Sequence, residues 1–437
     1  MFNYYLKLGW LSIRTNPWLS LLMVAAIGTG IGACMTILTV NHAMSSNPIP
    51  QKSEVLFHVQ LDSWEAGEPG PDGYNPPDQM TYRDAIALQE EAPAFRSVAN
   101  NRSGLVLEPE GGDENPYTVD IRNTWADFFP MFDLPFLYGS GWDESADENR
   151  EAVVVLSREL NDRVFGGENS VGRTVRMSGI NFRVVGVIDE WLPVPKYYDV
   201  TNGAFNLPEE AFIPFTFAIE QDLPRNGNTN CWKPVDGEGR DAFLNSECAW
   251  IQFWAELRNE EEEAAYMSWL NAYVEEQKVL GRFPRPLNNR LNDVMEWMED
   301  RQVVEDDAQV MLGLSFLFLV VCLLNTIGLL LAKFMRKTGD ISVRRALGAR
   351  RSDLFLQHMI EAGLIGLGGG VLGLGLTWLG LRGIEVLFGD FVEHLVHLDW
   401  QMMLTAIALA IVSALVAGLY PTWRAMQIMP ASQLKTQ

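Results

Sequence analysis

The sequence predicts a membrane α-helical protein with four transmembrane helices and a large mixed α/β domain inserted between the first helix and the second. Three observations predict this fold class. The 437-residue chain is 48% hydrophobic and contains four long apolar runs. Its charge is segregated, so that the long stretch after the first run is strongly acidic. Within that stretch, apolar and polar residues alternate in several short segments, which is typical of β-strands.

Each of the four apolar runs reaches the roughly 20 residues that a helix needs to cross the hydrocarbon core of a bilayer. A soluble core rarely needs four such runs, so a membrane protein is favoured over a soluble one. The expected spans, the first of them extended by a stalk, cover residues 17–43, 308–333, 357–384 and 400–422.

The charged residues that flank the runs predict their orientation. Residues 1–16, the loop 334–356 and the tail 423–437 carry basic residues in excess, whereas the loop 385–399 is acidic. By the positive-inside rule, both termini and the 334–356 loop are cytoplasmic. Residues 44–307 and the acidic loop then lie outside.

Two alternatives exist for the first run, a cleaved signal peptide and a lipoprotein cleavage box at Ile31–Cys34. The run is longer than the apolar core of a signal peptide. It also continues past Cys34 as "MTILTV", where a lipidated protein usually turns polar. An uncleaved span is therefore the favoured interpretation.

The acidic segment 44–307 has a net charge of −28, and the rest of the chain has a net charge of +5. A nucleic-acid binder presents a basic face on its folded domain, so this distribution argues against nucleic acid as a partner.

The acidic segment is expected to hold both strands and helices. The expected elements are a strand at 54–64, a helix at 76–93 opened near Asp78, a strand at 117–123, a strand and a helix at 150–167 with caps at Ser157 and Gly166, a hairpin at 174–190, a strand at 249–257 and a helix at 259–281. Residues 191–247 are rich in Pro, Asn and Gly and predict a long irregular insertion. Residues 291–308 are compatible with a helix, so an unbroken stalk helix is expected to lead into the second span.

The four cysteines divide between the spans and the outer domain. Cys34 and Cys322 lie within spans. Cys231 and Cys248 lie in the outer domain, where an oxidising compartment would allow a disulfide between them. Two free or buried thiols are the alternative.

No motif for catalysis or phosphate binding is present in the sequence, which lacks GxxxxGK[ST], GxSxG, HExxH and CxxC. His394 and His397 have helical spacing, but two interfacial polar residues are a better interpretation than a metal site. The glutamates at 260–263 are favoured as the solvated start of a helix. We expect no catalytic residue, no metal site and no directly bound cofactor.

Small and polar residues inside the spans predict contacts between helices. Gly28 and Gly32 have the spacing of small residues that lets two helices approach closely. Asn325 and Glu361 are polar groups in apolar spans and are expected to face a neighbouring helix. The glycine-rich run 363–376 is expected either to pack tightly or to be locally flexible.

The basic loop 334–356 has more features than a membrane anchor needs. Asp340 is the expected cap of a short helix that Gly348 ends, and Ser352 is the expected cap of the next helix. The short helix combines an apolar side with basic edges and connects closely to two spans. Its residues include Asp340, Ile341, Val343, Arg344, Arg345, Ala346, Leu347 and Gly348.

This part of the sequence resembles the MacB/FtsX-type permeases of ABC transporters. The matching stretches are "NTIGLLLAK" at 325–333, "DISVRRALGARRSDLFLQHMIEA" at 340–362 and "GLYPTWRAMQIMPASQLK" at 418–435. The stretch 117–188 is similar to the MacB periplasmic core domain. The layout of one span, a large domain and three further spans also matches.

The resemblance implies a non-catalytic permease subunit of a bacterial inner membrane, with the large domain periplasmic and the spans in membrane lipid. It implies an ABC ATPase subunit dimer, which carries ATP and Mg, and a second permease copy or a paralogue. Residues 340–348 would form the coupling helix on the ATPase. The work would be export of a peptide, toxin or small amphiphile, in some members through a periplasmic adaptor and an outer-membrane duct. A lipoprotein-releasing permease and a regulator of a periplasmic enzyme are the alternatives.

Three features depart from the family pattern. No ATPase domain precedes the first span, which implies a separate ATPase chain. An acidic residue common in this loop of the family is not matched near residues 334–337. Residues 191–247 fit the family least well.

Overall fold

The computed structural model describes residues 2–70, 73–109, 115–304, 306–388 and 400–427. The chain forms two compact units, which we call the membrane unit, Met1–Ser45 with Val304–Gln437, and the outer unit, Ser46–Val303. The predicted histidine pair, His394 and His397, lies outside the described residues.

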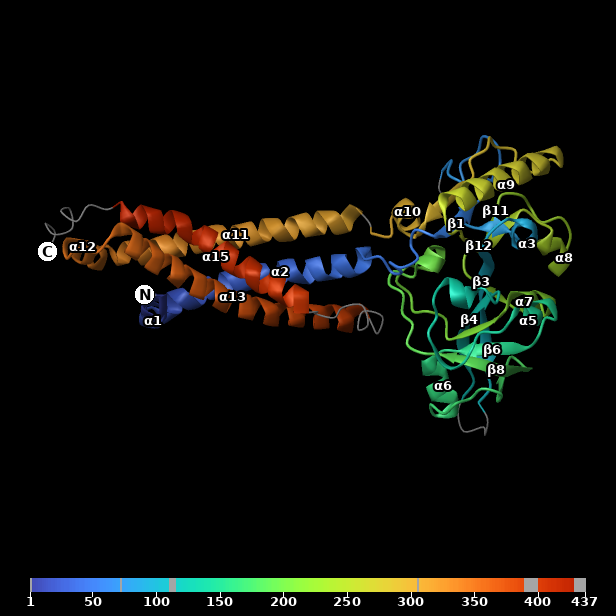
Figure 1. Ribbon diagram of the computed structural model, residues 1–437, viewed down its shortest axis with the longest axis horizontal. Coiled ribbons are helices and arrows are strands. Elements are labelled where there is room, and N and C mark those ends of the chain that lie inside the picture. Colours follow the sequence, from blue (N-terminus) through green and yellow to red (C-terminus); the bar gives the residue numbers. More distant parts are fainter. Residues whose placement is uncertain (1, 71–72, 110–114, 305, 389–399, 428–437) are drawn as a thin grey trace. The chain divides into compact units, whose positions relative to one another are not determined.

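Helices build the membrane unit (Figure 1). They are α1 (Phe2–Thr15), α2 (Pro17–Ser45), α11 (Asp306–Arg336), α12 (Thr338–Ala346), α13 (Arg351–Phe388) and α15 (Trp400–Met426). Among the described residues, α2, α11, α13 and α15 are long and apolar enough to cross a membrane. The predicted four spans are thereby confirmed, whereas α1 had been expected only as a terminal segment.

Close contact between α2 and α13 depends on glycine. A Cβ atom added at Gly28 would lie 2.9 Å from Leu372 Cγ, and one at Gly32 would lie 2.7 Å from Leu376 Cβ. In the other direction, a Cβ at Gly369 would lie 2.6 Å from Ile27 Cγ2. The glycine-rich run therefore packs tightly, as the first of its two interpretations expected.

Asn325 does not take the role expected of it within the chain. Its side chain is exposed on α11, whereas Thr326 is buried and donates a hydrogen bond of 2.9 Å from Oγ1 to the Cys322 carbonyl. The reason is helical phase, because α11 presents Asn325 together with the exposed residues Val321 and Leu324.

The outer unit is built around a large mixed sheet (Figure 1). Its strands are β1 (Leu56–Gln60), β2 (Met80–Thr81), β3 (Arg96–Leu107), β4 (Tyr117–Thr124), β5 (Phe136–Gly139), β6 (Val153–Leu156), β7 (Thr174–Met177), β8 (Ile180–Ile188), β9 (Ala211–Pro214), β10 (Arg225–Asn226), β11 (Asn230–Cys231), β12 (Cys248–Glu256) and β13 (Arg290–Asp293). The main path through the sheet is β13-β1-β12-β3-β4-β9-β6-β8-β5.

The long strand β3 joins the two halves of this sheet. Its first part pairs with β12, where Asn100 lies opposite Gln252, and its second part pairs with β4, where Asn101 lies opposite Asn123. One half packs a core that includes Phe253 and the other a core that includes Phe182. The two halves therefore share one continuous strand.

Short helices complete the outer unit. They are α3 (Tyr82–Glu91), α4 (Phe128–Met131), α5 (Glu144–Glu148), α6 (Arg158–Phe165), η1 (Tyr197–Asn202), α7 (Phe215–Glu220), α8 (Arg240–Leu244), α9 (Glu260–Val279) and α10 (Val294–Asp300). The α6 caps are as expected, because the Ser157 side chain accepts from Leu160 N and Gly166 is left-handed. Helix α3 is capped by Thr81 rather than near Asp78, because Thr81 Oγ1 accepts from Asp84 N.

Residues 191–247 are irregular over more than half of their length, as expected, but they also contain the short elements η1, β9, α7, β10, β11 and α8. A second expectation for the outer unit is wrong. The expected stalk helix at 291–308 is interrupted after α10, since Gln302 has a left-handed φ of +48°. The interruption lets Val303 pack into the same core as Trp297.

Candidate functional site

The short helix α12 follows α11 with almost no interval. Lys337 is its N-cap residue, and Lys337 N donates to the Phe334 carbonyl at the end of α11. Asp340 is thus in the first turn rather than at the cap, where its charge still favours the helix N-terminus. Ser352 is also not a cap, because α13 already begins at Arg351. Gly348, with φ of +100°, ends the short helix as expected.

One side of α12 packs against the membrane unit, and the other is exposed as far as the described residues show. Ile341 and Ser342 are buried. Val343 is 50% exposed and Leu347, directly after the helix, is 84% exposed. The remaining predicted site residues are exposed or half-buried: Asp340, Arg344, Arg345, Ala346 and Gly348.

Two arginines attach the end of α12 to other helices. Arg344 Nη1 donates to Gln357 Oε1 on α13 at 3.2 Å. Arg345 Nη1 donates to the Met426 carbonyl of α15 at 3.4 Å. The exposed side of α12 therefore has a fixed orientation relative to the spans.

A buried charged cluster lies next to the start of α12. Glu361 on α13 is fully buried, and its Oε1 lies 2.6 Å from Lys333 Nζ on α11. Lys333 Nζ also donates to Ser20 Oγ on α2 at 3.1 Å. Ser12 Oγ on α1 donates to Glu361 Oε1 and accepts a hydrogen bond from Lys337 Nζ. Polar groups of α1 and α11 thus converge on the Glu361 carboxylate of α13, and α2 joins the cluster through Lys333.

Glu361 was expected from the sequence to face a neighbouring helix, but its partners were not predicted. Lys333 was placed at the end of the predicted second span 308–333, and Ser12 in the predicted cytoplasmic segment 1–16. A signal was present, because Lys333 and Glu361 are opposite charges at the adjoining ends of two predicted spans, and buried charges in membranes are paired.

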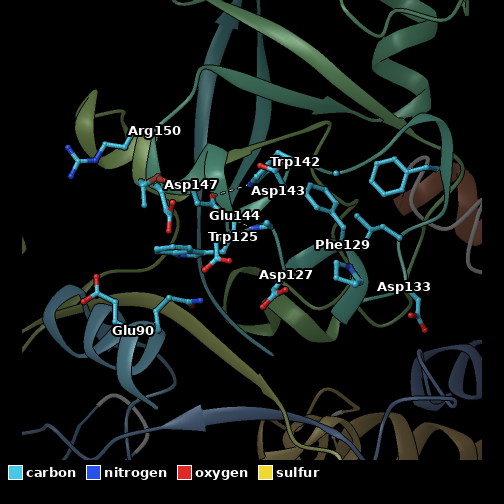
Figure 2. Close-up of a pocket in the computed structure, with 18 residues that line it drawn as sticks. Glu90, Trp125, Asp127, Phe129, Asp133, Trp142, Asp143, Glu144, Asp147 and Arg150 are labelled. Atoms are coloured by element: carbon cyan, nitrogen blue, oxygen red, sulfur yellow. Dashed lines mark hydrogen bonds between the residues drawn. The ribbon is translucent and has the colours of Figure 1, made fainter. Parts of the chain in front are cut away.

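The outer unit contains an acidic cavity of about 1170 Å³ (Figure 2). Aromatic rings of Trp125, Phe129 and Trp142 form part of its wall. Arg150 also lines the cavity. The acidic lining residues are Glu90, Asp127, Asp133, Asp143, Glu144, Asp147 and Glu148. Such a wall attracts cations and excludes anions.

Asp147 is the most perturbed acid of this cavity. Its Oδ1 accepts a hydrogen bond from Trp142 Nε1 at 3.0 Å and its Oδ2 accepts one from Ala126 N at 2.8 Å. Burial raises the pKa of Asp147 to about 7. Among the residues that the structure describes, no group of three or more His, Cys, Asp or Glu is placed to hold a metal ion.

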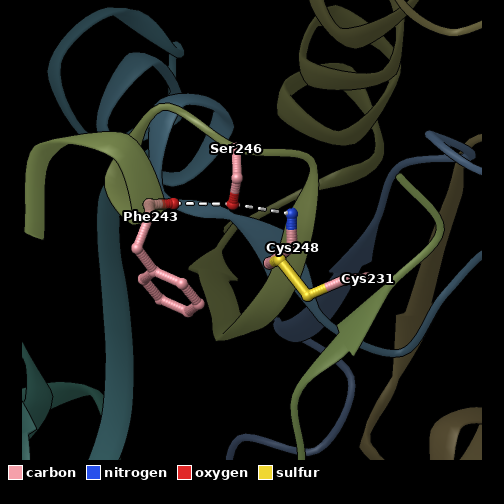
Figure 3. The surroundings of a disulfide bond; sticks show 4 residues. All are labelled: Cys231, Phe243, Ser246 and Cys248. Carbon is pink, nitrogen blue, oxygen red and sulfur yellow. Dashed lines mark hydrogen bonds between the residues drawn. A yellow bond between two sulfur atoms is a disulfide. The ribbon is translucent and has the colours of Figure 1, made fainter. Parts of the chain in front are cut away.

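The two outer cysteines form a disulfide between β11 and β12, Cys231–Cys248 (Figure 3). Ser246 Oγ donates to the Phe243 carbonyl at 2.6 Å and accepts from Cys248 N at 3.2 Å. The other cysteines, Cys34 and Cys322, are free and buried.

Models of two known protein families match this sequence. The model of the MacB-like periplasmic core domain matches residues 20–272, more than half of the chain. The chain belongs to this family. The model of the FtsX-like permease C-terminal part matches residues 312–430, a region that includes α12 and Glu361. The protein is therefore a MacB/FtsX-like ABC transporter permease and a multi-pass membrane protein with a periplasmic-type domain.

Several curated proteins are distant relatives of this MacB-like permease. It is 23% identical over 388 residues to the macrolide export ATP-binding/permease protein MacB of Syntrophobacter fumaroxidans, covering 82% of this chain and 52% of that protein. It is 22% identical over 439 residues to the pyoverdine export ATP-binding/permease protein PvdT of Pseudomonas entomophila, covering 99% of this chain and 59% of that protein. The chain thus spans about half the length of the curated relatives it matches.

A solved structure is also similar to this MacB-like permease. The periplasmic region of MacB from Actinobacillus actinomycetemcomitans aligns with 15% identity and a TM-score of 0.36, covering 59% of this chain and 96% of that one.

Proposed function

We propose that this permease converts ATP hydrolysis by a separate ATPase subunit into movement of its outer unit. In this proposal α12 is the coupling helix and docks on the ATPase, which binds ATP and Mg. ATP binding draws the ATPase subunits together and displaces α12. The spans α2 and α11 then carry the displacement to the outer unit.

The observation that carries the proposal is the exposed side of α12. Leu347 is 84% exposed and Val343 is 50% exposed, although both lie in a short segment that the membrane unit holds at both ends. Exposed apolar residues on a fixed surface, with Arg344 beside them, are typical of a docking site for another protein. The basic residues of the same loop favour a cytoplasmic location, where an ATPase operates.

The resemblance to the family supports a proposal for the rest of the assembly. The proposed complex contains two permease chains, this one and a second copy or a paralogue, on an ATPase dimer in the bacterial inner membrane. Both chain termini are cytoplasmic and the outer unit is periplasmic. The work is export of a peptide, toxin or small amphiphile. An adaptor and an outer-membrane duct are expected only if the cargo also crosses the outer membrane.

Two substitutions on α12 test the docking site in the complex formed with the ATPase. Because Leu347 is exposed and the hydrogen bond from the Arg344 side chain to Gln357 is also exposed, Leu347→Glu and Arg344→Glu should leave the fold of the chain intact. Each is expected to weaken ATPase co-purification about tenfold or more, since loss of ~1.4 kcal/mol of docking energy has that effect. Leu347→Met keeps an apolar side chain and is the matched control. Retention of the ATPase at wild-type level by both Glu variants would show that α12 is not the docking site.

A further inference from the structure

The charged cluster at Glu361 is directly connected to the start of α12. Lys337 directly follows Arg336, the last residue of α11, and is the N-cap of α12. Its side chain donates to Ser12 Oγ on α1, and its Nζ lies 4.0 Å from Glu361 Oε1 on α13. A displacement of α12 therefore moves the backbone of Lys337, and the Lys337 side chain contacts α1 and α13.

The cluster carries more charge than helix packing needs. Lys333 and Glu361 form a buried pair, with side chains 1% and 0% exposed. Well-packed apolar residues usually stabilise a fold as well as a buried ion pair does, and often better. Lys337 adds a second positive charge at 25% exposure, which the pair does not require for neutrality. Stability alone therefore does not explain why Lys337 points into the cluster.

The other faces of Glu361 are occupied by groups of its own helix and of α11. His358 on α13 places Nδ1 3.6 Å from Glu361 Oε2, and its ring lies 4.4 Å from the Phe334 ring on α11. The Glu361 carboxylate is thus buried among the described residues. If Lys337 moves, the carboxylate cannot simply rotate into solvent. A pull on Lys337 reaches α1 through its hydrogen bond to Ser12, and it reaches α13 because Ser12 donates to Glu361.

We propose that Lys337 and Glu361 form a positioning joint that transfers displacement of α12 to α1 and α13. The joint acts through other residues and touches neither nucleotide nor cargo. This inference rests on the proposed function, because it assigns a role to residues that lie behind the docking surface. Without the joint, the ATPase still docks and hydrolyses ATP, but α13 and the outer unit do not respond.

The test uses the complete complex with its ATPase and follows movement directly. Spin labels are attached at position 276 in the outer unit and position 356 at the start of α13, both exposed, with Cys34 and Cys322 replaced by Ala. The distance distribution is compared with and without Mg-ATP. Co-purification of the ATPase and the rate of ATP hydrolysis are measured on the same samples.

Three lysine variants separate transfer from folding. Lys337→Met leaves the Lys333–Glu361 pair neutral and intact, so the chain should fold and bind the ATPase. We expect the fraction of molecules that respond to ATP to fall about fivefold or more, the lower end of usual coupling between sites. Lys337→Arg keeps charge and reach and should respond like the wild type. Lys7→Met removes an exposed lysine of α1 and is the matched control.

A double variant separates an ionic joint from simple packing. Lys333→Met with Glu361→Leu replaces the pair by apolar side chains, and we expect a folded complex that hydrolyses ATP without the distance change. A wild-type response in this variant, or in Lys337→Met, would overturn the joint. Loss of ATPase binding in Lys337→Met would also overturn it, because Lys337 would then belong to the docking surface. If the wild-type complex itself shows no ATP-driven change, the proposed function fails and not only the joint.

Discussion

Arg122 Nη2 lies 2.5 Å from Glu209 Oε1, and neither side chain is exposed to solvent. The same guanidinium donates to Asp199, and its Nη1 donates to Asn100 Oδ1 at 2.9 Å. Lys196 Nζ donates to Glu209 Oε1 at 2.7 Å. This network attaches η1 and the segment before β9 to the centre of the sheet, which is how an apparently irregular insertion acquires a fixed structure.

We predict that Arg122→Met destabilises the outer unit strongly. Two carboxylates would remain buried with Lys196 as their main cation, and removing one partner of a buried charge network usually costs about 3–5 kcal/mol. Denaturant unfolding of the purified chain measures the loss. Arg176→Met removes an arginine that is 56% exposed and should change the free energy of unfolding by less than about 0.5 kcal/mol. Equal effects of the two substitutions would contradict the role of the network.

His58 makes the outer unit sensitive to acid. Its ring lies 3.7 Å from the Trp297 ring and 5.2 Å from the Trp254 ring, measured between centroids. Burial, helped by the charge of Arg301, lowers its pKa from 6.5 to about 3. The unfolded chain therefore binds a proton that the native chain does not, so the free energy of unfolding falls as pH decreases from 6.5 toward 3.

His58→Phe should remove this part of the pH dependence. We expect the variant to lose less stability than the wild type between about pH 7 and pH 4, with a difference of about 3 kcal/mol. Tryptophan fluorescence during denaturant unfolding at several pH values is the measurement. Parallel pH profiles of the two proteins would show that His58 is protonated normally in the native state.

The Cys231–Cys248 disulfide should stabilise the outer unit. The cysteines are 17 residues apart, and closing a loop of that size typically contributes about 3 kcal/mol. The double variant Cys231→Ser with Cys248→Ala should therefore unfold at lower denaturant concentration. Wild-type protein treated with a reducing agent should behave like the variant, and the variant itself should not respond to that treatment. Peptide mapping that recovers both wild-type cysteines as free thiols would rule out the bridge.

Asn325 should contact a second permease chain. An amide exposed to lipid near the middle of a span is unfavourable, so a partner helix is expected to cover it. A photoreactive amino acid at position 325 should crosslink to a second copy or to a paralogous permease in membranes. The same amino acid at position 326, which is buried within this chain, is the control. Crosslinks from position 325 to lipid alone would contradict this prediction.

Elements with local signals were predicted well, and elements that depend on distant partners were not. Ser157 and Gly166 define α6 from their own chemistry, and Ser178 with Gly179 defines the turn between β7 and β8. Strand β3 was missed because its middle is polar. Asn100 is buried and accepts a hydrogen bond from Arg122, which is 22 residues away in the sequence. The sequence near Asn100 therefore does not reveal that a buried partner is available.

The same division applies to the site. The position of α12 could be predicted from the basic loop and Gly348. Its start was predicted about one turn too late, because Asp340 was taken as the cap instead of Lys337. Glu361 was recognised as a polar residue that needs a partner. Its partners Lys333 and Ser12 could not be assigned, because the rotation of three helices about their axes decides which polar groups meet.

The two chain connections to the outer unit enter the sheet side by side. After Ser46 the chain soon forms β1, and before Val303 it leaves through β13 and α10, while β1 and β13 pair antiparallel with Phe57 opposite Asp293. The start of one strand is therefore adjacent to the end of the other. A force that spreads the two connections would unzip this ladder one hydrogen bond at a time, whereas a force shared by both would leave it unloaded. We therefore expect the outer unit to stay intact when α2 and α11 move together. When they move apart, we expect the β1–β13 pairing to break first.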